Sequence, residues 1–247
     1  MRNQSIITLL TLCATGSALS DALGFRLDAY SWSQEYEGTV QSGPDIFNIN
    51  SDLGLDDDSQ SSFGLALEHP VPLLPNIALR RTEMETEATG TVSGVFNRVT
   101  YSGQVRTESD LTHTDLTLYY EILDNWASID LGVTIRKFDE GVRLQGLTGI
   151  SAGLSSEEII DETIPLIYLA AKFELPLTGL YVGGQVNAIQ YDDDEIVDYS
   201  VQIGYESEWG LGAEIGFRSL EIDYEDAIAE AADLTIDGIY AGLFYHF

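Results

Sequence analysis

The sequence predicts an all-β fold: a single antiparallel transmembrane β-barrel of about ten strands, with eight or twelve as alternatives. Apolar and polar side chains alternate with a period of two along much of the chain, and short connections alternate with mostly longer ones. A period of two is that of a β-strand with two different faces. After the N-terminal region no segment is apolar for the roughly 18 residues that indicate a transmembrane helix, which leaves strands to cross a membrane.

The alternation defines the strands. In the central predicted hairpin, Leu116 and Leu118 face one way while Thr117 and Tyr119 face the other. The ten predicted strands cover approximately residues 23–33, 61–69, 77–86, 112–123, 127–138, 164–175, 180–191, 198–206, 210–221 and 235–247.

The connections are sorted by length. Those after the second, fourth, sixth and eighth strands are short (70–76, 124–126, 176–179, 207–209), whereas the others are mostly long (34–60, 87–111, 139–163, 192–197, 222–234). Short periplasmic turns and longer extracellular loops are typical of outer-membrane barrels, and a soluble sandwich has no reason to sort its loops in this way. Trp126, Tyr205 and Trp209 lie at or beside short turns, where interfacial aromatic residues are expected.

The terminal strand carries a second signal. Ile239, Ala241, Leu243, Tyr245 and Phe247 are expected to face lipid, and Tyr240, Gly242, Phe244 and His246 the lumen. Tyr240, Gly242, Tyr245 and Phe247 resemble, position by position, the C-terminal assembly signal of bacterial outer-membrane barrels. The resemblance implies recognition by the barrel-assembly machinery.

The N-terminus predicts export. Arg2 precedes a short apolar run at residues 6–14, and Ala18 and Ser20 fit a cleavage site. We therefore expect a signal peptide at 1–20 and the barrel at 21–247, with cleavage after Ala22 as the alternative. Cys13 would be removed with the signal, so the exported chain would contain no disulfide. Periplasmic chaperones and the outer membrane of a Gram-negative bacterium are the expected partners and destination.

The chain is strongly acidic, with 11 Lys and Arg against 41 Asp and Glu. Such a charge excludes nucleic-acid binding through phosphate contacts. Because 44% of the residues are hydrophobic, including 13 tyrosines, the acidity does not indicate disorder.

The strand phase predicts a charge network in the lumen, because buried charges need partners. The inward cations are Arg26, Arg80, Arg136, Lys172 and Arg218, and the inward anions are Asp28, Glu68, Asp115, Glu121, Asp130, Glu174, Glu206 and Glu214. Inward bulk comes from Tyr30, Trp32, Tyr119, Tyr168, Tyr181 and Tyr240. About ten strands so filled should leave a narrow or closed interior.

Two acidic clusters lie in predicted loops: Asp56, Asp57 and Asp58, and Asp192, Asp193, Asp194 and Glu195. Clustered carboxylates can bind Ca²⁺, but neither cluster has the spacing of a calcium-binding loop. A solvated acidic rim is the favoured interpretation, with divalent ions that bridge it to lipopolysaccharide as a hypothesis. No cofactor is expected.

No catalytic motif is visible. His113 and Asp115 lie on one strand face and are the one pair that resembles a base and its orienting carboxylate, with Ser102, Thr112 and Thr114 nearby in sequence. A polar role for His113 near a strand end is the favoured interpretation.

A family resemblance covers separated stretches of the chain: residues 65–77 (LALEHPVPLLPNI), 52–56 (DLGLD), 23–27 (LGFRL) and the terminal Phe247. These stretches resemble a gammaproteobacterial family of outer-membrane barrels of about this length with no assigned function. The resemblance implies the fold and the location and brings no catalytic residues. We expect a monomeric structural or surface-interaction barrel with a filled lumen, with a narrow channel for small solutes and a membrane-embedded hydrolase as alternatives.

Overall fold

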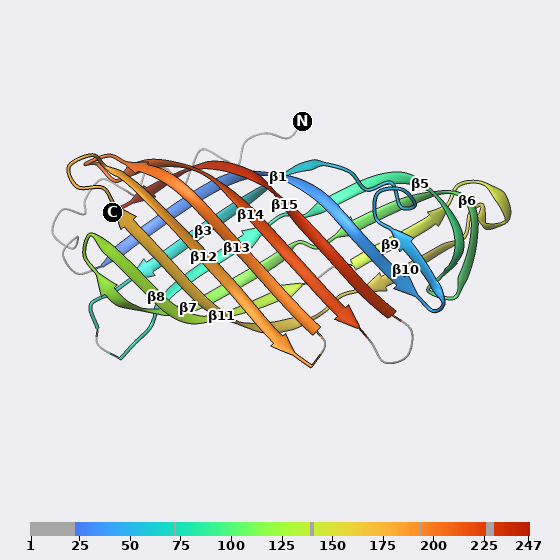
Figure 1. The fold of residues 1–247 in the computed structure, drawn as a ribbon, viewed down its shortest axis with the longest axis horizontal. Coiled ribbons are helices and arrows are strands. Elements are labelled where there is room, and N and C mark those ends of the chain that lie inside the picture. Colours follow the sequence, from blue (N-terminus) through green and yellow to red (C-terminus); the bar gives the residue numbers. More distant parts are fainter. Residues whose placement is uncertain (1–22, 72, 139–140, 193, 226–229) are drawn as a thin grey trace, which may run out of the picture.

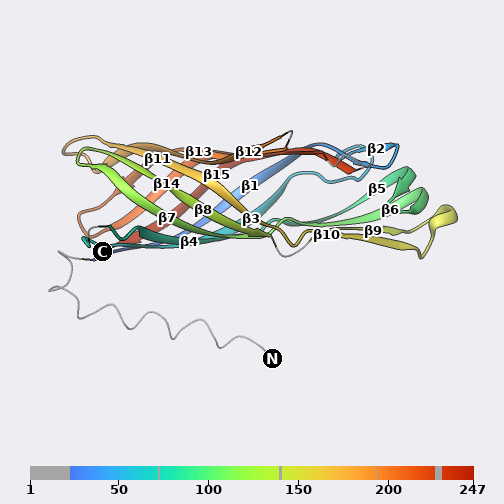
Figure 2. The ribbon, with the colours of Figure 1, turned by 90° about the horizontal axis from the view of Figure 1, so that it is seen from below.

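The computed structural model describes residues 23–71, 73–138, 141–192, 194–225 and 230–247. The predicted signal peptide, residues 1–20, lies outside the described residues, which begin at Leu23. Across the described chain, ten strands form one antiparallel ring that closes where the last strand pairs with the first. The predicted barrel is confirmed. Figures 1 and 2 show the tilted strands and the C-terminus at the end that carries the short turns.

The ring follows the chain order. Its strands are β1 (Gly24–Ser42), β3 (Asp58–Glu68), β4 (Asn76–Thr82), β7 (His113–Asp124), β8 (Ala127–Phe138), β11 (Thr163–Glu174), β12 (Leu180–Tyr191), β13 (Asp194–Glu206), β14 (Leu211–Glu225) and β15 (Glu230–His246). Each predicted strand corresponds to one of these. The third was predicted too long, because β4 ends at Thr82 and a separate strand begins at Glu85.

The barrel closes between the two ends of the chain. Phe25 N donates to Phe247 O at 2.7 Å, and Phe247 N donates to Phe25 O at 2.9 Å. Their rings stack with centroids 5.3 Å apart. From there the β1–β15 pairing runs to Ser42 and Glu230, so the two strands stay paired from the short-turn end to the opposite end of the barrel.

Part of what the sequence predicted as loops is further strand. β5 (Glu85–Phe96), β6 (Val99–Asp110), β9 (Gly141–Gly146) and β10 (Ser155–Ile159) form a second sheet, and β2 (Asp45–Asn48) pairs with the end of β1. A short 3₁₀ turn, η1 (Gly149–Ser151), connects β9 and β10. Figure 1 shows this sheet at the end opposite the C-terminus. The segments contain many Thr, Ser and Gly residues, which hid their alternation. Their buried side chains, among them Val92, Tyr101 and Leu144, pack in an apolar core.

The outer face of the ring is apolar. Ile167, Val201, Ile215 and Leu243 are each more than half exposed in the isolated chain, as residues that contact lipid would be. Trp126 and Trp209 are also exposed and lie beside short turns, where interfacial aromatics belong. The terminal strand has the predicted phase: Tyr240 and Phe244 are buried, while Ile239, Leu243 and Tyr245 are exposed. The described chain contains no helix long and apolar enough to cross a membrane.

Inward glycines make room for inward aromatic rings. Tyr30 lies directly across from Gly242, and Phe244 directly across from Gly212. A Cβ atom added to Gly242 would lie 2.2 Å from Tyr30 Cδ1, and one added to Gly212 would lie 2.1 Å from Phe244 Cζ. The same relation holds for Tyr181 with Gly204 and for Tyr240 with Gly216. These pairs fix the register, because a shifted strand would place a side chain where each ring lies.

Candidate functional site

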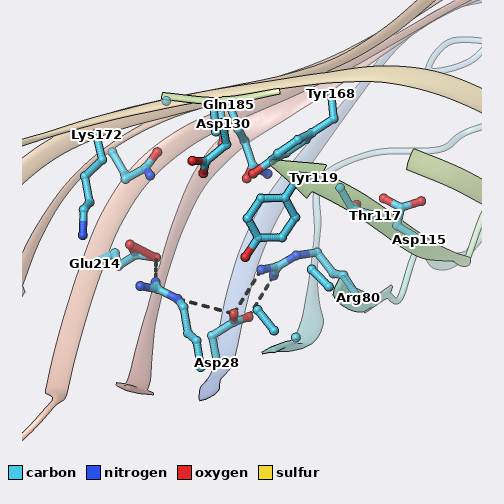
Figure 3. A pocket seen from close by; sticks show the side chains of 18 of the residues that line it. Asp28, Arg80, Asp115, Thr117, Tyr119, Asp130, Tyr168, Lys172, Gln185 and Glu214 are labelled. Atoms are coloured by element: carbon cyan, nitrogen blue, oxygen red, sulfur yellow. Dashed lines mark hydrogen bonds and ion pairs between the residues drawn. The ribbon is translucent and has the colours of Figure 1, made fainter. Parts of the chain in front are cut away.

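The end of the lumen near the short turns holds a polar cavity of about 460 Å³. Inward side chains of the ring strands line it, and Figure 3 shows several that point into it. Of the predicted charges, Arg26, Asp28, Glu68, Arg80, Asp115, Glu121, Asp130, Lys172, Glu174, Glu214 and Arg218 line this cavity. Arg136 and Glu206 are not among the residues that line it.

Asp28 and Glu214 connect strands β1, β4, β12 and β14 across the cavity. Asp28 lies 3.0 Å from Arg80 Nη1 and 3.8 Å from Arg26 Nε. Arg26 Nη2 also donates to Glu214 Oε1 at 3.1 Å. The same carboxylate accepts hydrogen bonds from the hydroxyls of Tyr30 and Tyr181. Both carboxylates are almost fully buried, and the guanidinium groups of Arg26 and Arg80 balance their charge.

A second group of predicted charges lies closer to the short turns. Lys172 Nζ lies 2.9 Å from Glu174 Oε1, and His246 Nδ1 lies 3.3 Å from Glu206 Oε1. Tyr119 donates to Glu68 at 3.1 Å. Glu121 and Asp130 line the cavity and also take part in interactions. The predicted charges therefore gather in groups at different depths of the lumen.

The deepest group crosses the lumen as a layer that we call the charged layer: Asp115, Arg136, Asp198 and Arg218. Arg136 donates to both oxygens of Asp115, at 2.8 and 2.7 Å, and to Asp198 at 2.5 Å. Arg218 donates to both oxygens of Asp198, at 2.9 and 2.7 Å. Its guanidinium also lies 4.6 Å from the centroid of the Trp32 ring. The layer therefore joins β7 and β8 to β13 and β14 through paired, nearly solvent-free ions.

Asp198 is the charge that sequence reasoning missed. It is 4% exposed and bridges the two arginines. The predicted strand began at residue 198, whereas β13 begins four residues earlier, so Asp198 stood at the predicted strand end. Its parity with Ser200 and Gln202 was the signal that could have assigned it to the inward face.

His113 is the first residue of β7, so it lies near a strand end as the sequence predicted, but its burial was not predicted. Its side chain is 1% exposed, its Nδ1 lies 3.0 Å from the Leu111 carbonyl oxygen, and its ring lies 5.3 Å from that of Phe138. It is buried because β7 starts beneath the second sheet, formed by β5, β6, β9 and β10, rather than at an open rim. We call this sheet the extracellular sheet, because it lies at the end of the barrel opposite the short turns. His113 Nε2 has no hydrogen-bond partner among the described residues.

The hydroxyls considered as nucleophiles do not join His113. Thr112 Oγ1 accepts a hydrogen bond from Met84 N at 3.0 Å. Thr114 Oγ1 contacts the exposed Arg81 at 3.5 Å, and Ser102 belongs to β6 in the second sheet. None of the three is arranged with His113 as a nucleophile with its base.

The described residues of the acidic clusters are not among the groups with metal-ligand spacing. Asp56 and Asp57 are exposed, and Asp194 Oδ1 accepts a hydrogen bond from Glu225 N at 3.0 Å. Asp193 lies outside the described residues. Within the described chain, the group with metal-ligand spacing is His113, Asp115 and Asp198, whose ligand atoms lie within 4.8 Å of one another. Both carboxylates are already engaged by arginines, so the group does not fit a cation well.

Beyond the charged layer lies a second cavity, of about 520 Å³ and mainly apolar lining. Tyr36, Leu53, Leu111, Phe138 and Ile236 are among its walls. No described residue lines both cavities. The lumen is thus divided into a polar chamber, a layer of paired ions and an apolar chamber.

The structure resembles known outer-membrane proteins. It is similar to the outer membrane protease OmpT from Escherichia coli, with a TM-score of 0.53 and 11% identity over 91% of this chain and 97% of that one. It is also similar to the translocator domain of autotransporter NalP from Neisseria meningitidis, with a TM-score of 0.48 and 12% identity over 93% and 92%. For the toluene transporter TodX from Pseudomonas putida the values are 0.36, 11%, 92% and 89%. No protein-family model and no curated protein matches the sequence.

At such identities the likeness concerns the fold and no activity. The closed antiparallel ring, its apolar outer face and its polar interior define an outer-membrane β-barrel. The chain is a protein of the bacterial outer membrane.

Proposed function

We propose that this protein is a surface-interaction barrel whose lumen is closed to the passage of solutes. The observation that carries the proposal is the charged layer. Arg136 is fully buried between two carboxylates, and Arg218 packs against Trp32 beside it. A solute crossing here would have to separate paired ions in a nearly water-free environment, which costs several kcal/mol.

The extracellular sheet supports the interaction part of the proposal. Four described strands, β5, β6, β9 and β10, extend beyond the ring, and their buried side chains belong to an apolar core that they share with ring strands. Ordered strands present a stable surface to other molecules, whereas long irregular loops would lose entropy on binding. The proposed partners are lipopolysaccharide, outer-membrane lipid, periplasmic chaperones and the barrel-assembly machinery. The proposed oligomeric state is a monomer.

Planar-bilayer recording of the purified protein tests the closed lumen. We expect no steady ion conductance from the wild-type protein. The double variant Arg136→Ala and Asp198→Ala removes one ion of each sign from the layer, and we expect it to conduct. Heat-modifiable migration on gels identifies folded barrels, so the comparison includes only protein that has folded.

A narrow channel for small solutes is the second candidate. The polar cavity of about 460 Å³ favours it, because water and small polar solutes can occupy the part of the lumen near the short turns. Regular single-channel steps from wild-type protein would replace the closed-lumen proposal with this one. A membrane-embedded hydrolase has less support, since Ser102, Thr112 and Thr114 are not arranged as nucleophiles with His113. Lipid and peptide hydrolysis assays test it directly.

Membership in the gammaproteobacterial family remains part of the proposal. It rests on the stretches at residues 23–27, 52–56 and 65–77, of which the last contains the turn between β3 and β4. The signal peptide at 1–20 remains a proposal in the same sense, and N-terminal sequencing of the exported protein tests it.

A further inference from the structure

The apolar chamber has the size and lining of a small-molecule site. Its volume of about 520 Å³ falls in the range of ligand pockets, roughly 300–1,000 Å³. Its walls come from two sides: Val40, Leu234 and Ile236 on β1 and β15, and Val142 and Ile159 on β9 and β10. A solute that replaces water against these side chains gains the free energy of apolar burial.

The barrel wall beside this chamber contains an interruption. β11 pairs with β8 as far as Thr163, but its pairing with β12 ends at Ile167 and Ala188. β12 itself continues to Tyr191, where it pairs with β13. The residues 163–166 and 189–191 are therefore neighbouring strand segments without a shared ladder. We call this interruption the β11–β12 seam.

Pro165 accounts for the seam. Phe138 N donates to Glu162 O and Leu175 N donates to Leu180 O, which shows that even-numbered residues of β11 bond toward β8 and odd-numbered residues toward β12. Continuing the register of Ile167 with Ala188 would place Pro165 opposite Gln190. Proline has no N–H to donate at that position, and the ladder stops there.

The seam lies in the wall of the chamber. Ile164, Ile189 and Tyr191 flank the seam and also line the chamber. Tyr191 is 72% exposed, so the lining beside the seam is accessible in the isolated chain. Ile167, the first residue of β11 that pairs with β12, is 65% exposed on the outer face of the ring. The seam therefore begins at the border of the apolar outer face.

The charges around the chamber have one sign. The described residues that line it include six carboxylates and no lysine or arginine: Glu37, Glu158, Glu162, Asp194, Glu195 and Asp223. An anionic head group would meet repulsion and no cationic partner there. The chamber is therefore suited to an apolar molecule without an anionic group.

We propose that the apolar chamber binds an uncharged hydrophobic small molecule, which enters from the outer leaflet through the β11–β12 seam. This path does not cross the charged layer, so the proposal holds whether or not the lumen conducts. It adds a ligand and a route to the proposed surface barrel.

The site is tested with two dyes of the same skeleton. N-phenyl-1-naphthylamine is uncharged, and 1-anilinonaphthalene-8-sulfonate adds one sulfonate. The purified protein is reconstituted in phosphatidylcholine vesicles, and empty vesicles give the partitioning background. We expect saturable binding of the uncharged dye and at least about tenfold weaker binding of the anion, since its charge would be buried beside carboxylates. Equal affinity for both dyes would overturn the assigned ligand class.

A matched pair of variants locates the site. Ala232→Trp fills the chamber, whereas Ala241→Trp adds the same side chain on the exposed face of the same strand. We expect the first to weaken binding of the uncharged dye at least about tenfold by occupying its volume, and the second to leave it unchanged. Unchanged binding in a folded Ala232→Trp protein would overturn the site.

The entrance needs a kinetic test. Pro165→Val restores the N–H opposite Gln190 and lets the ladder continue, so we expect stopped-flow association to slow at least about fivefold while affinity changes little. Ile167→Val, one pair further along the intact ladder, is the control and should bind at the wild-type rate. An unchanged association rate in Pro165→Val would overturn the lateral entrance and leave the chamber site standing.

Discussion

Asp198 accepts hydrogen bonds from both Arg136 and Arg218 and so connects two arginines that approach it from different strands. Asp115 holds the other side of Arg136. Two cations and two anions balance within the charged layer, and the free energy of the layer depends on that balance.

Removing Asp198 should therefore destabilise the barrel strongly. Asp198→Ala leaves two buried guanidiniums with one carboxylate, and we expect a loss of about 3–5 kcal/mol in the free energy of unfolding. Urea titration in lipid vesicles, followed by tryptophan fluorescence, measures it. Asp161→Ala is the control, because Asp161 is mostly exposed and lies 3.9 Å from Lys137. A similar small effect for both variants would contradict this view of the layer.

The glycine opposite Phe244 should tolerate no side chain. Gly212→Ala places a Cβ about where the ring now lies, and we expect a loss of about 1–3 kcal/mol from overpacking. The same urea titration applies. Adding Phe244→Leu should recover most of the loss, because the smaller side chain vacates the space. Additive losses in the double variant would mean that the two positions are not coupled.

Phe247 should matter for assembly more than for lipid contact. We expect Phe247→Ala to lower the yield of folded protein in the outer membrane, if Tyr240, Gly242, Tyr245 and Phe247 act as the assembly signal. Phe173→Ala is a matched control, since both phenylalanines are 46% exposed. Quantitative blotting of membrane fractions compares them. Equal yields would count against the assembly signal.

Chelation should leave the protein's stability unchanged. Asp56 and Asp57 are exposed and do not converge, and the carboxylates beside His113 are engaged by arginines. We expect EDTA to shift neither the urea midpoint nor the amount of lipopolysaccharide that co-purifies. A lowered midpoint that Ca²⁺ restores would instead support divalent ions bridging the acidic rim.

The sequence predicts the ring well because side-chain parity in a strand is a local property. Each ring strand overlaps a predicted one, and Arg26, Asp28 and Arg80 all lie on the inward face as their parity indicates. Parity does not say which inward residues meet. The contact of Arg136 with Asp198 depends on the stagger of strands far apart in the chain, which no local pattern contains.

The extracellular sheet and the seam were missed for different reasons. In β5 and β6, small polar residues such as Thr86 and Thr107 occupy buried positions, so hydropathy does not alternate where burial does. Pro165 was included in a predicted strand, and β11 does contain it. Its effect appears only once the direction of each backbone group is known, because the same proline is harmless toward β8 and disruptive toward β12.

The backbone bonds between Phe25 and Phe247 also constrain the time course of folding. They join the first and last strands of the described chain, so the contact that closes the ring has the largest sequence separation that the fold contains. Contacts of high separation form slowly, because the chain between them must be ordered first. Until they form, β1 and β15 both present unpaired edges. The partly folded barrel therefore has two unpaired strand edges, and it needs protection from aggregation until the ring closes in the membrane.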